Sequence, residues 1–243
     1  MRIAFIVEYD GTSYAGWQIQ KNDVTVQEKI EEALLPMGKG RIAVFGAGRT
    51  DSGVHAKGQC GHFDIDTNIP AEKFAFILNS RLPKDIRIKK TWQAEEGFHC
   101  RFSAKGKRYI YRIFNSPHSS ALLGRFTMHV PEKLDLEKMV EAAEYIKGTH
   151  DFKAFCAQGS SVKTTVRTVS LLEIKKTDEL IEIIVEGNGF LYNMVRIIAG
   201  TLIEVGKLKK TPQDVKNIID GMNRADAGLT AEACGLTMDT VFY

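Results

Sequence analysis

The segment Gly46-Ala-Gly-Arg-Thr-Asp-Ser-Gly53 combines residue types that can do chemistry. Its three glycines in eight residues permit positive φ angles and close approach of a ligand or another backbone. Between them stand one cation, one anion and two hydroxyl groups. Loops at strand ends often carry reactive groups on a rigid scaffold. We therefore interpret the segment as a functional loop with Asp51 as its carboxylate; a tight turn closed by that carboxylate is the structural alternative.

Two familiar uses of a glycine-rich loop fail on spacing. The dinucleotide-binding fingerprint requires its third glycine at the position of Asp51. The phosphate loop of nucleotide hydrolases requires Gly-Lys-Ser/Thr, whereas here Gly53 is followed by Val54. We therefore expect no nucleotide cofactor.

Hydrophobic periodicity predicts the elements that position this loop. A two-residue period predicts a strand over 2–9, and Thr25 with Glu28 has the capping-box spacing of a helix start. Pro70 is expected to open a second helix. Further strands are predicted over 41–45, 61–65 and 85–90.

The second part of the chain repeats this pattern. Asp135 is expected to cap a helix whose inward face includes Met139, Val140 and Ala143. A helix is predicted over 191–205, and a short one starts at Thr211. The predicted strands cover 107–114, 166–176, 180–186 and 236–242.

The order of elements predicts an α+β fold. Units of strand, helix and strand pair occur on either side of about residue 100, as in two ferredoxin-like split βαβ halves. We assign 1–103 to the half with the Asp51 loop and 104–243 to the half with a tyrosine strand and an arginine helix. The halves are expected to share a mixed, largely antiparallel sheet, with a central catalytic cleft between them.

Composition sets broad limits on the class of protein. The chain has 243 residues, 44% of them hydrophobic and 26% charged, as in soluble globular proteins. Its early apolar run, 3–7, is too short for a signal peptide or a membrane span. We therefore expect a cytoplasmic protein without membrane contact. The net charge of +3 is compatible with an anionic partner without requiring one.

The cysteines and histidines form no recognisable ligand motif. The four cysteines are scattered and are expected to be reduced thiols. His55, Cys60, His62 and the pair His99-Cys100 lack the spacing of a zinc site. We therefore expect that the protein binds no metal.

Four segments, in order along nearly the whole chain, resemble one family. Gly48-Arg-Thr-Asp-Ser-Gly-Val-His-Ala56 is similar to the hallmark of the tRNA pseudouridine synthase A family. The other three segments are 8–18, 98–103 followed by 107–111, and 188–200. Ser52 stands where many members have alanine, a small-for-small change that leaves the chemistry intact.

The resemblance implies the pseudouridine synthase fold and an isomerase that converts uridine to pseudouridine. The substrate it implies is the anticodon stem-loop of tRNA, at tRNA positions 38, 39 and/or 40. It also implies a homodimer that needs no cofactor. Asp51 would be the catalytic nucleophile. Whether this carboxylate attacks the sugar or abstracts a proton from it is open.

The same resemblance assigns roles to four substrate-binding residues. Arg196 would supply a guanidinium to Asp51, and Arg49 would hold the flipped nucleotide. Tyr109 would pack on the target base, although Tyr111 shares its strand face and is the alternative. Phe190 would line the same pocket.

Two rival functions come from other classes. A non-catalytic RNA-binding module of split βαβ type has no use for a carboxylate in a loop that faces phosphates, because that charge repels RNA. A glycoside hydrolase requires two cooperating carboxylates, and only Asp51 stands in a site-like segment.

Overall fold

The computed structural model describes residues 1–38, 40–159 and 162–243. The chain forms two compact units, one of Met1–Lys105 with Thr237–Tyr243 and one of Gly106–Leu236. Each unit combines a sheet with helices, so the predicted α+β class is confirmed. The sequence placed 237–243 with the second half, whereas these residues belong to the first compact unit. The division into ferredoxin-like halves at 103/104 stays a prediction.

The first unit contains a mixed sheet. Within this unit the strand order is β4-β1-β3-β10, with the short β2 also paired to β3. β1 is antiparallel to β3 and β4, whereas β10 runs parallel to β3. The strands are β1 (Arg2–Tyr9), β2 (Val44–Gly46), β3 (His55–Asp64), β4 (Ile86–Gln93) and β10 (Leu236–Phe242).

Two helices accompany this sheet, α1 (Val26–Leu34) and α2 (Phe74–Asn79). The predicted capping box is present: the Thr25 hydroxyl accepts a hydrogen bond from the Glu28 amide, and the Glu28 carboxylate accepts one from the Thr25 amide. The buried core between helices and sheet includes Phe5, Phe63 and Phe74. The short 3-10 helices are η1 (Gly11–Ser13), η2 (Leu35–Met37) and η3 (Ala71–Lys73).

The strand expected over 41–45 is shorter and shifted, because it is Val44–Gly46. Val44 pairs with Phe63, and β3 ends one residue later at Asp64. By this register Ala43 would face Asp64, the last residue of β3, so residues 41 and 42 lie beyond the end of the strand with which β2 pairs.

The second unit contains a sheet of order β5-β9-β8-β7, with β6 paired to β5. All pairs are antiparallel except β5 with β6. The strands predicted over 166–176 and 180–186 pair as an antiparallel hairpin, and Asp178 adopts φ 51° at its turn. The strands are β5 (Gly106–Phe114), β6 (Met128–His129), β7 (Gly148–Asp151), β8 (Val166–Thr177) and β9 (Leu180–Gly187).

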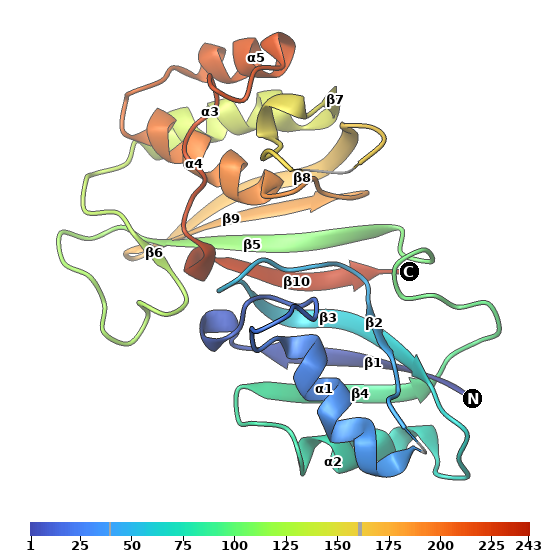
Figure 1. Ribbon diagram of the computed structural model, residues 1–243. Coiled ribbons are helices and arrows are strands. Elements are labelled where there is room, and N and C mark those ends of the chain that lie inside the picture. Colours follow the sequence, from blue (N-terminus) through green and yellow to red (C-terminus); the bar gives the residue numbers. More distant parts are fainter. Residues whose placement is uncertain (39, 160–161) are drawn as a thin grey trace. The chain divides into compact units, whose positions relative to one another are not determined.

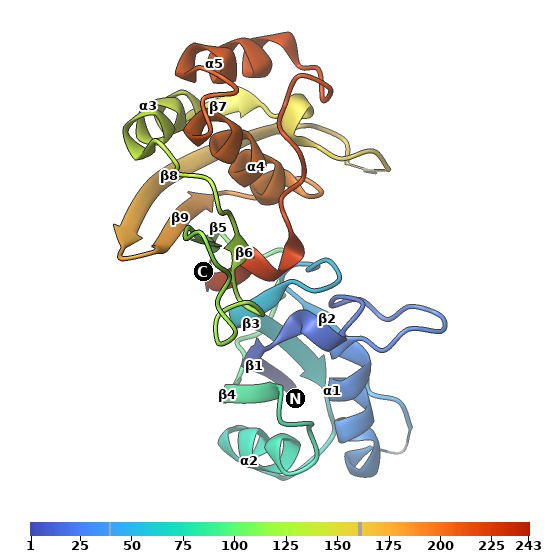
Figure 2. The same cartoon turned by 90° about the vertical axis from the view of Figure 1, so that its left-hand side faces the viewer.

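Helices α3 (Leu136–Ile146) and α4 (Met194–Gly206) lie against one face of this sheet, and α5 (Pro212–Gly221) packs farther out (Figures 1 and 2). The 3-10 helices are η4 (Lys153–Phe155) and η5 (Ala233–Gly235). None of the helices formed by the described residues has the length and hydropathy needed to cross a membrane.

Two expectations for these helices need correction. Val140 was expected to face inward but is 44% exposed. It follows buried Met139 by one residue, and one residue turns the helix by about 100°, away from the core. The helix expected from residue 191 begins at Met194, because Asn193 has the left-handed φ of 59°.

Candidate active site

The loop between β2 and β3 is tied to the protein through its backbone. The Ala47 amide donates to the Cys60 carbonyl at 2.8 Å, and the Trp17 amide donates to the Thr50 carbonyl at 3.1 Å. The Val54 amide donates to the Asp51 carbonyl at 3.1 Å, which closes a turn around the carboxylate-bearing residue. The backbone on both sides of Asp51 is thus held before any substrate is present.

Two glycines allow the N-terminal segment to support this loop from behind. A Cβ atom at Gly11 would collide with the Val54 carbonyl, and one at Gly16 would collide with the Thr50 carbonyl. Gly16 also has φ +91°, a conformation that glycine adopts at little cost. The Gly53 amide donates to the Tyr14 carbonyl at 3.2 Å. The similarity of segment 8–18 to the family's opening therefore has a structural reason.

Arg49 and Asp51 differ from the residues around them in exposure. Arg49 is exposed, and no acidic side chain among residues 1–38, 40–159 and 162–243 forms an ion pair with it. Asp51 is half-buried, whereas the intervening Thr50 is 7% exposed. The loop therefore buries the Thr50 side chain. The guanidinium of Arg49 and the carboxylate of Asp51, on either side of Thr50, are more exposed.

Polar side chains from two strands lie beneath the loop. The Tyr9 hydroxyl of β1 and the Thr50 hydroxyl are 2.8 Å apart. Burial raises the pKa of Tyr9, so its phenol is neutral at physiological pH. Gln59 of β3 donates its Nε2 hydrogen to the Gly48 carbonyl at 2.5 Å. Neither residue was predicted from the sequence to belong to the site; the available signal was a glutamine inside a strand with many buried residues.

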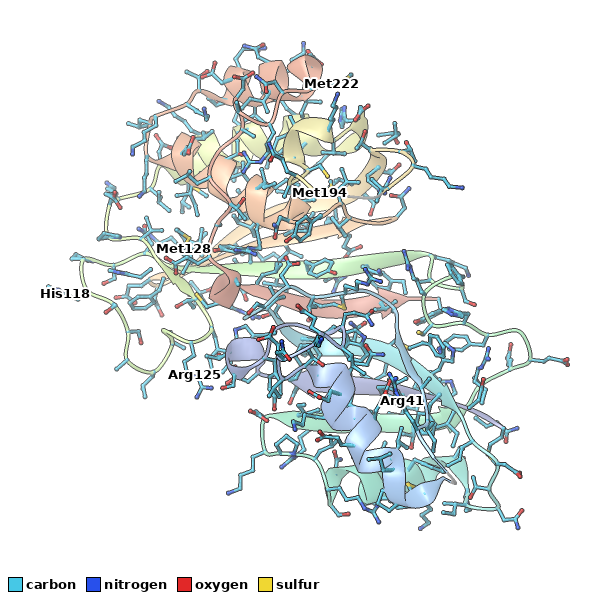
Figure 3. The ribbon with its side chains drawn as sticks, in the orientation of Figure 1. Arg41, His118, Arg125, Met128, Met194 and Met222 are labelled. Atoms are coloured by element: carbon cyan, nitrogen blue, oxygen red, sulfur yellow. The ribbon has the colours of Figure 1, made fainter. Side chains whose placement is uncertain are left out.

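In the second unit, Tyr109 and Tyr111 of β5 have different environments. The Tyr109 ring packs edge-on against the Phe190 ring, with centroids 5.1 Å apart and an interplanar angle of 84°. Tyr111 is fully buried, and its hydroxyl donates to the Glu232 carbonyl at 2.8 Å. The same hydroxyl lies 3.3 Å from the sulfur of Met128, a residue of β6. Figure 3 labels Met128. Burial raises the pKa of Tyr111.

Arg196 lies in the first turn of α4, two residues after the buried Met194 that begins the helix and is labelled in Figure 3, and is half-buried. Its Nε atom donates to the Ala231 carbonyl at 2.7 Å, and its Nη1 atom donates to Asn193 Oδ1 at 3.0 Å. The Ala231 amide donates in return to the Arg196 carbonyl at 3.1 Å. Ala231 and Asn193, which accept these two bonds, lie in the same unit as Arg196.

The site residues predicted from sequence thus form local groups. Arg49 and Asp51 share one loop of the first unit. Tyr109 and Phe190 are in contact in the second unit, where Arg196 has its own anchors. The pairing of Asp51 with Arg196 stays a prediction.

The structure brings together three potential metal ligands that their spacing had not suggested. Ligand atoms of His62, His99 and Cys100 lie within 4.8 Å of one another. The Nδ1 atom of His62 accepts the Cys100 amide at 3.4 Å, and that of His99 accepts the Arg101 amide at 3.1 Å. An imidazole nitrogen that accepts such a bond leaves the proton of the neutral ring on Nε2, which then cannot ligate a metal. These contacts favour a structural role, and the prediction that no metal is bound remains a prediction.

Burial supports the neutral form of His62. This side chain is 1% exposed, and desolvation, aided by the Arg2 charge, lowers its pKa to about 4. Its ring stacks on Phe45, with centroids 5.0 Å apart.

Comparisons with known proteins bear on the family to which this chain belongs. A family model described as tRNA pseudouridine synthase matches residues 5–103 and 142–243. The chain is 50% identical over 243 residues to a tRNA pseudouridine synthase A of Ruminiclostridium cellulolyticum, covering 100% of this chain and 99% of the relative. It is 48% identical over 241 residues to a tRNA pseudouridine synthase A of Acetivibrio thermocellus, covering 99% of each chain.

A third relative has the same name. The tRNA pseudouridine synthase A of Bacillus pumilus is 47% identical over 245 aligned residues, covering 100% of this chain and 99% of the relative. Because identity at this level extends over entire chains, the similarity is not confined to a local motif. The chain therefore belongs to the tRNA pseudouridine synthase family, a family of isomerases.

Proposed function

We propose that this protein converts uridine to pseudouridine in the anticodon stem-loop of tRNA, at position 38, 39 and/or 40, with Asp51 as the catalytic nucleophile. Family membership supports the reaction and the class of RNA. The observation that carries the proposal is the half-buried Asp51 carboxylate, whose backbone is closed by a turn and braced by 11–17.

The chemistry explains why a single carboxylate suffices. The reaction breaks the bond between uracil N1 and the ribose, rotates the base, and joins the ribose to carbon-5, which loses its hydrogen. Substrate and product have the same oxidation level, so the reaction requires no redox cofactor. Positive charge develops on the sugar when the bond breaks, and an ionised carboxylate answers it as nucleophile or counter-charge. The fixed backbone of Asp51 keeps that carboxylate in place as the charge develops.

Arg196 is proposed to keep Asp51 ionised. Removal of a carboxylate from water raises its pKa, and a neighbouring guanidinium opposes that rise. A guanidinium retains its charge at any physiological pH. The two hydrogen bonds to Ala231 and Asn193 hold the Arg196 side chain in one orientation, which supports such a role.

Tyr109 and Phe190 are proposed to contact the target base. An edge-to-face aromatic pair presents a preformed apolar wall on which a uracil ring can pack. Both rings are buried, but Tyr111 is less suited to this role, because it is 0% exposed against 8% for Tyr109 and its hydroxyl already donates to the Glu232 carbonyl. These environments favour Tyr109 over Tyr111.

Arg49 is proposed to stabilise an extruded nucleotide. A uridine inside a stem must leave the base stack before a side chain can reach its sugar, at a cost of a few kcal/mol. Arg49 is exposed and two residues from Asp51, and none of the described acidic groups neutralises it. Its guanidinium is therefore available to occupy the vacated space or to contact phosphate.

The remaining expectations concern assembly and location. The family resemblance implies a homodimer that acts on tRNA in the cytoplasm. A molar mass near twice 27.1 kDa in light scattering would support the dimer, and a mass near 27.1 kDa at micromolar concentration would contradict it.

The proposal is tested by tritium release from unmodified tRNA that carries 5-tritiated uridine. Bond formation at carbon-5 displaces that hydrogen, so release reports the proposed reaction directly. Wild type should release tritium, and Asp51→Asn should release none while still binding tRNA. Asp64→Asn is the matched control, because Asp64 is an exposed carboxylate of the same unit, paired with Arg2, and should retain activity.

Two other results would contradict the proposal. Tight tRNA binding without release by wild type would favour the non-catalytic RNA-binding module. Release by Asp51→Asn at the wild-type rate would show that another group is the nucleophile. Mapping the modified positions in the product then tests the choice of positions 38, 39 and 40.

A further inference from the structure

We propose that Gln59 and Tyr9 are positioning residues for the catalytic loop, each holding a residue adjacent to Arg49. This inference rests on the proposed function, since it concerns how Arg49 and Asp51 are presented to RNA. Neither residue touches the reacting atoms in the proposed reaction. Both act through Gly48 and Thr50.

The side-chain amide of Gln59 is buried, and within the described part of the chain only one of its two polar atoms is hydrogen-bonded. Its side chain is 0% exposed, and its Nε2 atom donates to the Gly48 carbonyl at 2.5 Å. Its Oε1 atom is buried without a hydrogen-bond partner among the residues that the structure describes. An unsatisfied buried acceptor carries a desolvation cost, which offsets the gain from the hydrogen bonds that the amide makes to the Gly48 carbonyl and to the Tyr9 hydroxyl. The stability of the fold therefore does not explain a glutamine at this position.

Tyr9 holds the residue on the other side of Arg49. Its ring is 2% exposed and packs against Trp17, with centroids 6.1 Å apart. Only its hydroxyl reaches the loop, where it meets the Thr50 hydroxyl at 2.8 Å. Phenylalanine would preserve the packing, so the hydroxyl contributes specifically to the orientation of Thr50.

The two bonds together define the path of the backbone through Arg49. Gln59 fixes the carbonyl of residue 48 from β3, and Tyr9 fixes the side chain of residue 50 from β1. Arg49 then projects to the exterior between Gly48 and Thr50, the two held residues. Asp51 comes directly after Thr50 in the chain. A displacement of about 1 Å at a catalytic group can lower the rate by roughly 10²-fold. Small shifts of this segment should therefore reduce turnover more than they reduce stability.

The first test is Gln59→Met, which keeps the length of the side chain and removes both polar atoms. The midpoint of thermal unfolding should stay unchanged or rise, because the unsatisfied oxygen is gone. Single-turnover tritium release at saturating enzyme should fall by about 10-fold or more. The affinity for tRNA should change much less. A merely structural glutamine would instead lose stability and keep its rate, which would overturn the proposal.

The second test separates the Tyr9 hydroxyl from its ring. Tyr9→Phe and Thr50→Val should each lower the single-turnover rate by about 10-fold, and the double variant should be no slower than either, because both remove the same bond. Thr50→Ser keeps the hydroxyl and should restore the rate. Tyr243→Phe is the control: its hydroxyl donates to the Cys100 carbonyl in the same unit, and its loss should leave turnover unchanged. Additive losses, or failure of serine to rescue, would overturn this part of the proposal.

Hydrogen exchange provides a readout that does not depend on catalysis. Amides 48–52 should exchange faster in Gln59→Met and Thr50→Val than in wild type, and at the wild-type rate in Tyr243→Phe. Unchanged exchange in all variants would overturn the inference even if the wild type proves inactive. Conversely, an active wild type with an inactive Asp51→Asn and a fully active Gln59→Met would preserve the proposed function and remove only this inference.

Discussion

The loop between β2 and β3 is held by hydrogen bonds of its backbone, whereas in the second unit the Arg196 guanidinium is held by hydrogen bonds of its own side chain. Asp51 follows a backbone held at Ala47 and Thr50. Arg196, by contrast, spends its own Nε and Nη1 hydrogens on Ala231 and Asn193.

This difference separates two kinds of substitution. Replacing Asp51 should remove the chemistry and leave the loop in place, because its backbone bonds do not involve the carboxylate. Replacing Arg196 should remove a charge and also free the Ala231 carbonyl. Activity and stability should therefore change separately in the loop and together in the second unit.

After the complete loss expected for Asp51→Asn, the largest effect is expected for Arg196→Met. Turnover should fall by about 10³-fold or more, as expected for the loss of an electrostatic partner at a reacting group. Affinity for tRNA should change little, and the free energy of unfolding should fall by about 1–3 kcal/mol. Filter binding, single-turnover release and denaturant unfolding measure the three quantities.

Arg224→Met is the matched control for Arg196→Met. Arg224 also hydrogen-bonds the backbone of this region, through the Gly228 carbonyl, and contacts the Thr230 hydroxyl. This control should lose stability and retain turnover. If Arg196→Met instead loses tRNA affinity in proportion to turnover, the guanidinium is a phosphate contact and the proposed pairing with Asp51 is wrong.

Smaller effects on turnover are expected for substitutions of the two tyrosines of β5. These substitutions compare two residues on the same face of one strand. We propose that the Tyr109 phenol also assists proton movement at the target base, so Tyr109→Phe should lower turnover by about 10-fold or more. Tyr111→Phe should lower the free energy of unfolding by about 1 kcal/mol, because it loses its bond to Glu232, with turnover retained. The reverse pattern would assign the active-site role to Tyr111.

The smallest effect on activity is expected at His62, whose bonds serve only the fold. The folded-state pKa of about 4 lies below the ordinary 6.5, so the unfolded chain binds more protons between these values. Stability should therefore fall as pH drops from 6.5 towards 4, by on the order of 2 kcal/mol from this group. Urea unfolding at pH 7 and pH 4.5 should show a smaller pH effect in His62→Gln. An identical pH effect in both proteins would exclude His62 as its source.

Local signals in the sequence were sufficient for many elements. The capping box of Thr25 and Glu28 correctly marked the start of α1, and the alternation of Arg2–Tyr9 correctly marked β1. Both patterns depend on residues close together in the chain. Local interactions are therefore enough to form these elements, with little help from tertiary contacts. The loop around Asp51 was recognised because its glycines, charges and hydroxyls are contiguous.

Only the tertiary structure showed how that loop is supported and how the environments of Tyr109 and Tyr111 differ. Gly11 meets Val54, and Gln59 meets Gly48, across distances in sequence that no periodic pattern encodes. A period of two places Tyr109 and Tyr111 on one face of β5, and only packing against Phe190 or Glu232 distinguishes them. The sequence by itself therefore determined the family, the main elements and the candidate carboxylate. The support beneath that carboxylate came from long-range contacts, because hydrogen-bond geometry depends on where the folded backbone brings each group.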